Sequence, residues 1–181
     1  MSKKQQKKKP YNRSQKTKQA EEQPKSRLKE AVDSITGLSN YLEEGLHAVK
    51  KADREHFKSD KSGQFNGSLG IDAAKKEAEY DANRWDYAIE YNGEVFFVEV
   101  HPRSTSDVDT MLKKLEWLQQ WLKNEAKAID QIKTTQTTPY YWVSTGANTI
   151  LKTSLNYKKL IQKKVVITRT LDCDKLFKKS V

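Results

Sequence analysis

Asp86, Glu99 and His101 are the three residues of this chain whose types and spacing best suit a chemical site. Two carboxylates held side by side are good ligands for Mg²⁺. A histidine beside them could bind metal, orient water or offer positive charge to a phosphate. The alternative for His101 is an ordinary hydrogen-bonded position at a strand end. The elements that carry the three residues decide whether they meet.

Two strands joined by a tight turn should position these residues. The runs 85–91 and 94–101 are rich in aromatic and β-branched residues, and only Asn92 and Gly93 separate them. An Asn-Gly pair between two such runs is typical of a type I′ hairpin turn, because both turn positions need positive φ. With a two-residue loop, the numbers of opposed residues sum to 185.

This register places Asp86 opposite Glu99 and Arg84 opposite His101. Directly opposed residues share a face of the sheet, with Cβ atoms about 4.5–5.5 Å apart, and like charges there are destabilising. A shared proton, a basic partner or a bound divalent cation would relieve the repulsion. The hairpin therefore predicts either a metal or catalytic site, or two carboxylates neutralised by Arg84 or a lysine.

The remaining sequence predicts an α/β fold with a mixed central sheet flanked by helices, because helical and strand patterns alternate along the chain. A segment rich in Gly, Ser, Asn and Asp at 59–70 predicts a loop. Asp72 could then cap a short helix over 73–80, or residues 68–74 could instead form a short strand. The other predicted elements are helices over about 26–52, 107–122 and 149–162, and strands over 85–91, 94–101, 140–144 and 164–171.

The chain has 181 residues and 35% hydrophobic content, which suits one globular domain with a polar tail. We expect residues 1–25 to form a disordered basic tail and residues 26–181 a single domain. Residues 1–27 carry eight of the ten net positive charges. The tail should bind phosphates electrostatically, or else only keep the chain soluble. Its candidate nucleic-acid contacts are Lys7, Lys8, Lys9 and Arg13.

A cytoplasmic location is expected from three features. No apolar run approaches the about 20 residues that span a bilayer, so no membrane partner is expected. The N-terminus lacks the apolar segment of a secretory signal. The lone Cys173 cannot form an internal disulfide, which favours a reducing compartment.

The hairpin from Asp86 to His101 resembles the core motif of the PD-(D/E)XK nuclease superfamily. That family places an Asp on one strand and Glu-x-Lys on the next, and its core order of helix, three strands, helix and strand is similar to residues 26–144. The resemblance implies a restriction-endonuclease-like core and an Mg²⁺- or Mn²⁺-dependent phosphodiesterase that hydrolyses DNA or RNA.

The resemblance also implies roles for individual residues. Asp86 and Glu99 would hold the metal, and Glu43 on the preceding helix is the candidate for the additional glutamate that the family often uses. His101 stands at the position of the family's lysine. A lysine of the following helix could replace it, and Lys114 is closer to that helix's apolar face than Lys113. Arg84 and Arg103, which flank the hairpin, are candidate nucleic-acid contacts.

Two rival hypotheses remain. Because His101 replaces the motif lysine, the chain could be a catalytically inactive nuclease-fold module that binds nucleic acid or a protein. Trp117 and Trp121 lie one turn apart, away from the leucine stripe of their predicted helix. Exposed tryptophans would suggest a protein partner or a homodimer, whereas the alternative is a helix that its own chain buries on two sides.

Overall fold

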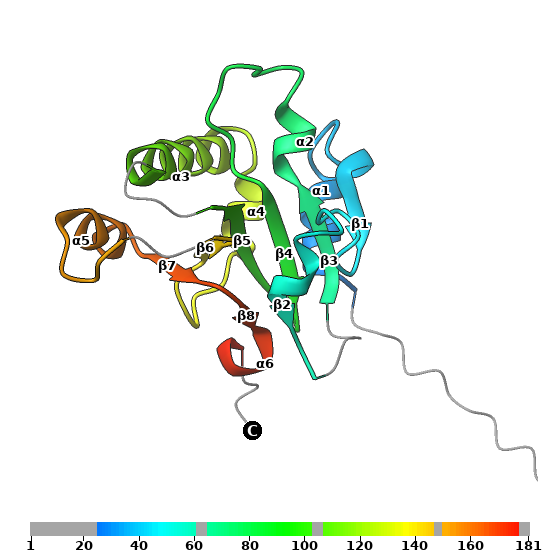
Figure 1. Ribbon diagram of the computed structural model, residues 1–181. Helices are drawn as coiled ribbons and strands as arrows, with labels where there is room; N and C mark the ends of the chain where they lie inside the picture. Colours follow the sequence, from blue (N-terminus) through cyan, green and yellow to red (C-terminus); the bar gives the residue numbers. More distant parts are fainter. Residues whose placement is uncertain (1–24, 61–64, 103–106, 147–149, 178–181) are drawn as a thin grey trace, which may run out of the picture.

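A six-stranded mixed sheet forms the centre of the computed structural model, with helices over one of its faces (Figure 1). The structure describes residues 25–60, 65–102, 107–146 and 150–177. Residues 1–24 of the tail predicted over 1–25 lie outside these ranges. None of the helices in the described part of the chain is long and apolar enough to cross a membrane. The prediction of an α/β fold with a mixed sheet flanked by helices is confirmed.

The sheet has the order β1-β3-β4-β5-β6-β7, and β2 and β8 form a separate parallel pair. Neighbours from β1 to β5 are antiparallel, whereas β5, β6 and β7 are parallel to one another. The strands are β1 (Leu42–Glu44), β2 (Phe57–Lys58), β3 (Phe65–Gly70), β4 (Tyr87–Tyr91), β5 (Glu94–His101), β6 (Tyr140–Ser144), β7 (Val165–Thr168) and β8 (Leu171–Asp172).

The helices connect these strands and cover mainly one face of the sheet. Two of them, α3 and α4, lie in the crossover between the parallel strands β5 and β6. The helices are α1 (Arg27–Asp33), α2 (Ile71–Lys75), α3 (Asp107–Asn124), α4 (Lys127–Ile132), α5 (Leu155–Gln162) and α6 (Cys173–Leu176), with 3₁₀ turns η1 (Ser39–Tyr41) and η2 (Arg54–His56).

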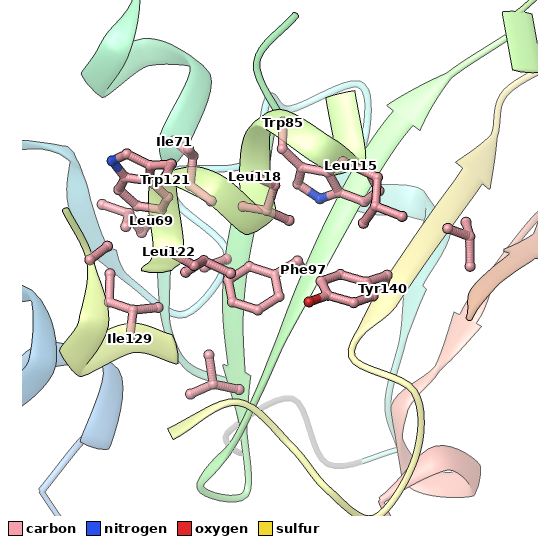
Figure 2. Packing of buried hydrophobic residues seen from close by; sticks show 14 of the residues in the cluster. Leu69, Ile71, Trp85, Phe97, Leu115, Leu118, Trp121, Leu122, Ile129 and Tyr140 are labelled. Atoms are coloured by element: carbon pink, nitrogen blue, oxygen red, sulfur yellow. The ribbon is translucent and has the colours of Figure 1, made fainter. Parts of the chain in front are cut away.

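The helical face of the sheet holds the larger hydrophobic core (Figure 2). Phe97 of β5 stacks on Tyr140 of β6, with ring centroids 5.9 Å apart. Leu118 and Leu122 of α3 pack over these rings. Burial of these aliphatic and aromatic side chains fixes α3 above β5.

The opposite face is covered by the β2–β8 pair and α6. Phe96 of β5 stacks on Phe177 just after α6, with centroids 4.9 Å apart. Tyr91 of β4 donates a hydrogen bond to the carboxylate of Asp174 in α6. Strands β4 and β5 are therefore buried on both faces, and a charged side chain there needs a specific partner.

The hairpin between β4 and β5 has the predicted register. Asn92 and Gly93 have φ values of 52° and 81°, as a type I′ turn requires. Tyr91 pairs with Glu94, and the ladder continues to Tyr87 and Val98. Every pair sums to 185, so the prediction from the two-residue loop is confirmed.

The predicted continuous helix over 26–52 is wrong. Helix α1 ends at Asp33, and the chain then forms turns and the edge strand β1. Gly37 and Gly45 have φ values of 84° and 57°, which a right-handed helix does not allow. The apolar residues that suggested a helix still point inward, as Leu38 and Val49 show, but from different elements.

Other boundaries also differ from prediction. The segment predicted as a loop over 59–70 includes β3, and α2 follows it directly. The helix expected over 149–162 begins only at Leu155. The strand expected over 164–171 is split into β7 and β8. Elements 107–124 and 140–144 lie where the apolar patterns placed them.

Glu90 of β4 joins α1 to the sheet through a buried carboxylate. It accepts hydrogen bonds from the backbone N–H groups of Arg27 and Leu28, at 3.1 and 2.9 Å, and from the hydroxyl of Ser26. Ser26 in turn accepts a hydrogen bond from the N–H of Lys29 as the N-cap of α1. Glu90 thus satisfies N-terminal helix donors that have no partner within the helix.

We expect Glu90→Gln to lower the free energy of unfolding by about 1–2 kcal/mol, because the amide replaces one accepting oxygen and the negative charge at the helix N-terminus. Urea unfolding at neutral pH measures this change. Glu77→Gln is the control, since Glu77 is exposed. Equal stability of the two variants would contradict a capping role for Glu90.

Candidate functional site

Asp86 and Glu99 meet at the end of the central hairpin, where β4 begins. The backbone N–H of Asp86 donates to Oε2 of Glu99 at 3.2 Å, and the N–H of Val100 donates to Oδ2 of Asp86 at 2.9 Å. Each carboxylate is therefore held by the backbone of the opposite strand. Glu99 is 1% exposed, and Asp86 is half-buried.

The backbone of Asp86 is fixed by the start of α2. Its carbonyl accepts hydrogen bonds from the N–H groups of Ile71 and Asp72, at 2.9 and 3.3 Å. The pairing of β3 with β4 ends one residue later along β4, at Gly70 and Tyr87. Asp86 therefore lies just beyond the β3–β4 pairing and next to the first residues of α2, with its side chain at the end of the sheet.

The structure brings Lys114, and not His101, to the carboxylate pair. Nζ of Lys114 lies 2.5 Å from Oε1 of Glu99. Helix α3 carries this lysine on the flank that faces the hairpin, and its half-buried stem follows the apolar side of the helix. The site therefore contains two carboxylates and one ammonium group supplied by three separate segments.

Burial is the main reason that the pKa values of both carboxyl groups are raised. Burial and, to a smaller extent, repulsion from the nearby Asp86 raise the pKa of Glu99 to about 8, and Lys114 only partly offsets these effects. The pKa of Asp86 is also raised, mainly by burial, although Lys114, the N–H of Val100 and Lys50 oppose the rise. The pair would be stabilised by additional positive charge.

His101 is half-buried at the end of β5. Its carbonyl accepts a hydrogen bond from Nε1 of Trp142 at 3.1 Å. Its imidazole makes no hydrogen bond or ion pair with the other described residues. The structure thus leaves the ring of His101 unattached to the carboxylates, although strand alternation places it on their face.

Glu43 does not join the pair. It lies exposed on edge strand β1, opposite Ser68 of β3. Strand β3 separates β1 from β4, so two strand spacings, about 10 Å, divide Glu43 from the strand next to Asp86. The expectation placed Glu43 on a helix that does not exist at this position. Within the described ranges, no three His, Cys, Asp or Glu side chains are grouped to hold a metal ion.

Arg84 has an internal partner instead of a surface position. Its Nε donates to Oδ1 of Asp72 at 2.9 Å, and its guanidinium also donates to the carbonyls of Glu79 and Tyr80. The side chain is 9% exposed. These contacts contradict the exposed position that a nucleic-acid contact requires, and Arg84 does not neutralise the carboxylate pair.

Several candidate contacts lie outside the described residues. These are Arg103 and the tail residues Lys7, Lys8, Lys9 and Arg13.

Trp117 and Trp121 are covered largely by their own chain. Their rings stack with centroids 5.9 Å apart and an interplanar angle of 4°. Trp121 is 4% exposed and belongs to the core, and Nε1 of Trp117 donates to Glu79 at 2.6 Å. The expected exposed surface for a protein partner or homodimer is therefore not formed by these tryptophans.

Lys50 is a second positively charged residue near Asp86, and the sequence did not indicate it. It lies in the turn region between β1 and β2, and its charge acts on Asp86 across the end of the sheet. No local pattern identifies it, because the chain from Gly45 to Lys50 was expected to be helical. Only the packing of this segment against β4 brings Lys50 close to Asp86.

Comparison of the chain with protein-family models, with curated proteins and with solved structures finds no match in any of the three.

The raised pKa of Glu99 predicts a stability loss with increasing pH. The folded chain retains a proton that the unfolded chain loses above its ordinary pKa of 4.5, so this stabilisation is complete below that pH and is lost as the pH rises through about 8. Relative to Glu99→Gln, which stays neutral, the wild type should lose at least about 1 kcal/mol of unfolding free energy between about pH 5 and 8.

Urea unfolding across this pH range in EDTA measures the effect. Glu116→Gln, at an exposed position on α3, is the control and should follow the wild type at every pH. A difference between wild type and Glu99→Gln that does not change with pH would contradict the raised pKa.

Proposed function

We propose that this chain is a metal-dependent nuclease-like protein of the PD-(D/E)XK type, which hydrolyses phosphodiester bonds in DNA or RNA. The observation that carries the proposal is the meeting of Asp86, Glu99 and Lys114 at one end of the central hairpin. Two carboxylates and a lysine are the side chains that the resemblance requires. Lys114 supplies the amine from a helix instead of from the strand position that His101 occupies.

The order of elements also supports the proposal. Helix α1 is followed by the antiparallel strands β3, β4 and β5, then by α3 and the parallel strand β6. This is the order of helix, three strands, helix and strand expected for a restriction-endonuclease-like core. The short elements η1, β1, η2 and β2 lie between α1 and β3 as additions to this order. Helix α2 is a further addition between β3 and β4, and α4 is one between α3 and β6.

The donor set fits Mg²⁺ or Mn²⁺. Mg²⁺ is commonly held by one or two carboxylates and keeps several waters, so Asp86 and Glu99 supply enough protein ligands without Glu43. Oδ1 of Asp86 accepts no hydrogen bond from any described residue. The repulsion between the two carboxylates would be relieved by a cation placed between them.

The protein residues would then have separate roles. A divalent cation held by Asp86 and Glu99 would polarise a phosphoryl oxygen and lower the pKa of a bound water. Lys114 orients the Glu99 carboxylate and places an ammonium group where negative charge develops on the phosphate. The basic N-terminal tail adds sequence-independent affinity that decreases with salt.

A catalytically inactive nuclease-fold module that binds nucleic acid is the second candidate. The observation that favours it is His101, whose ring stands at the motif's lysine position and makes no hydrogen bond or ion pair with either carboxylate in the described part of the chain. Cleavage and binding assays separate the two candidates directly.

We expect the full-length protein to cleave single-stranded or duplex DNA or RNA in Mg²⁺ or Mn²⁺. Glu99→Gln and Lys114→Gln should each lower the cleavage rate by about 10²-fold or more, because the first removes a ligand of the metal and the second removes the ammonium group at the reacting phosphate. Gel assays on labelled oligonucleotides measure the rates. Lys113→Gln is the matched control, since Lys113 is the exposed neighbour of Lys114 on α3 and should leave the rate unchanged.

Binding without cleavage of any of these substrates in either metal would overturn the enzyme proposal and support the inactive module. Cleavage by Glu99→Gln at the wild-type rate would contradict the assigned site.

A further inference from the structure

The turn that carries Lys50 is held rigidly against the start of β4. The N–H of Lys50 donates to the hydroxyl of Tyr87 at 3.3 Å, and its carbonyl accepts from the N–H of Asp53 at 2.8 Å. The same Tyr87 hydroxyl donates to Asp53. These bonds hold the backbone of Lys50 over the side chain of Tyr87, on the face of the sheet opposite Asp86. The charge of Lys50 still acts on Asp86 around the end of the sheet.

Neighbouring contacts strengthen this anchor. Val49 is buried in the core on that face of the sheet, and its carbonyl accepts a hydrogen bond from Nε of Arg54 at 2.8 Å. The N–H of Ala48 donates to the hydroxyl of Ser68 in β3 at 3.1 Å. Lys50 therefore projects from a well-packed turn, although it belongs to no helix or strand.

The side chain of Lys50 remains available for a ligand. It is exposed, and no ion pair links it to another residue in the described part of the chain. Lys114, by contrast, is bound to Glu99. An exposed ammonium group beside a buried acidic pair is suited to an anion that approaches the carboxylates from solvent.

The two lysines approach the pair from opposite faces of the sheet. Lys114 comes from α3 on the face of the larger core, whereas the turn of Lys50 packs over Tyr87 on the face covered by β2, β8 and α6. A phosphodiester lying across the end of β4 and β5 would have one lysine on each side.

We propose that Lys50 is a substrate-contacting residue that binds a non-bridging oxygen of the phosphodiester at Asp86 and Glu99. The inference rests on the proposed nuclease function and adds a residue outside the hairpin motif to the site. Lys50 neutralises charge on the phosphate and holds it across the sheet end, while Lys114 supports the carboxylates.

The test compares full-length wild type, Lys50→Gln, Lys50→Arg and Lys51→Gln on the oligonucleotide that the wild type cleaves. Lys51 is the exposed neighbour of Lys50 and controls for net charge. We expect Lys50→Gln to lower kcat/KM about tenfold, as loss of a charge-assisted hydrogen bond predicts. Lys50→Arg should recover most of the activity, and Lys51→Gln should stay close to wild type.

Fluorescence anisotropy in EDTA provides a readout without turnover. The plot of log affinity against log salt has a negative slope, and in Lys50→Gln this slope should become less steep by about 0.7–0.9, as expected for one lost phosphate contact. Thermal unfolding should give the same Tm for all four proteins, and Lys50→Arg keeps the test valid if the glutamine variant is destabilised.

Two results would overturn the inference in distinguishable ways. If the wild type cleaves and Lys50→Gln matches Lys51→Gln in both kcat/KM and salt slope, Lys50 does not contact substrate and the proposed function stands. If the wild type neither cleaves nor binds any nucleic acid, the proposed function fails and Lys50 has no substrate to contact.

Discussion

The turn at Asn92 and Gly93 sets the register on which the centre of this structure depends. Positive φ at both residues permits a two-residue loop, and that loop places Asp86 beside Glu99 at the far end of the hairpin. A shift of one residue would move every side chain of one strand to the other face. The core aromatics and the acidic pair are therefore specified by the same turn.

Two buried glutamates on this hairpin show how differently the same side chain can be accommodated. Glu90 accepts hydrogen bonds from Ser26, Arg27 and Leu28, so its charge is stabilised by donors at the start of a helix. Glu99 faces another carboxylate and has one lysine partner. Glu90 therefore strengthens the fold, whereas Glu99 retains an electrostatic conflict of the kind found at functional sites.

Local rules predicted the hairpin, its register and the helix that carries Lys114, because turn chemistry and side-chain periodicity act over a few residues. They failed for the segment around Gly37 and Gly45. Its apolar residues recur every three or four positions as in one long helix, but they belong to a short helix, turns and an edge strand. They also could not find the partners of Arg84 or the position of Lys50. The partners of Arg84 lie 4 to 12 residues before it, in a stretch that the sequence left open between helix and strand. Lys50 bonds to Tyr87 across 37 residues of sequence, so only tertiary packing creates that contact.

Lys114 belongs to helix α3 and not to strand β5, which carries Glu99. A lysine on β5 would be held relative to Glu99 by the covalent geometry of a single strand. Here the ammonium and the carboxylate belong to different layers, and their separation depends on how α3 rests on Phe97 and Tyr140. The geometry of the site therefore depends on the hydrophobic packing between α3 and the sheet. Substitutions at Leu118 or Leu122 could thus tune its chemistry from a distance.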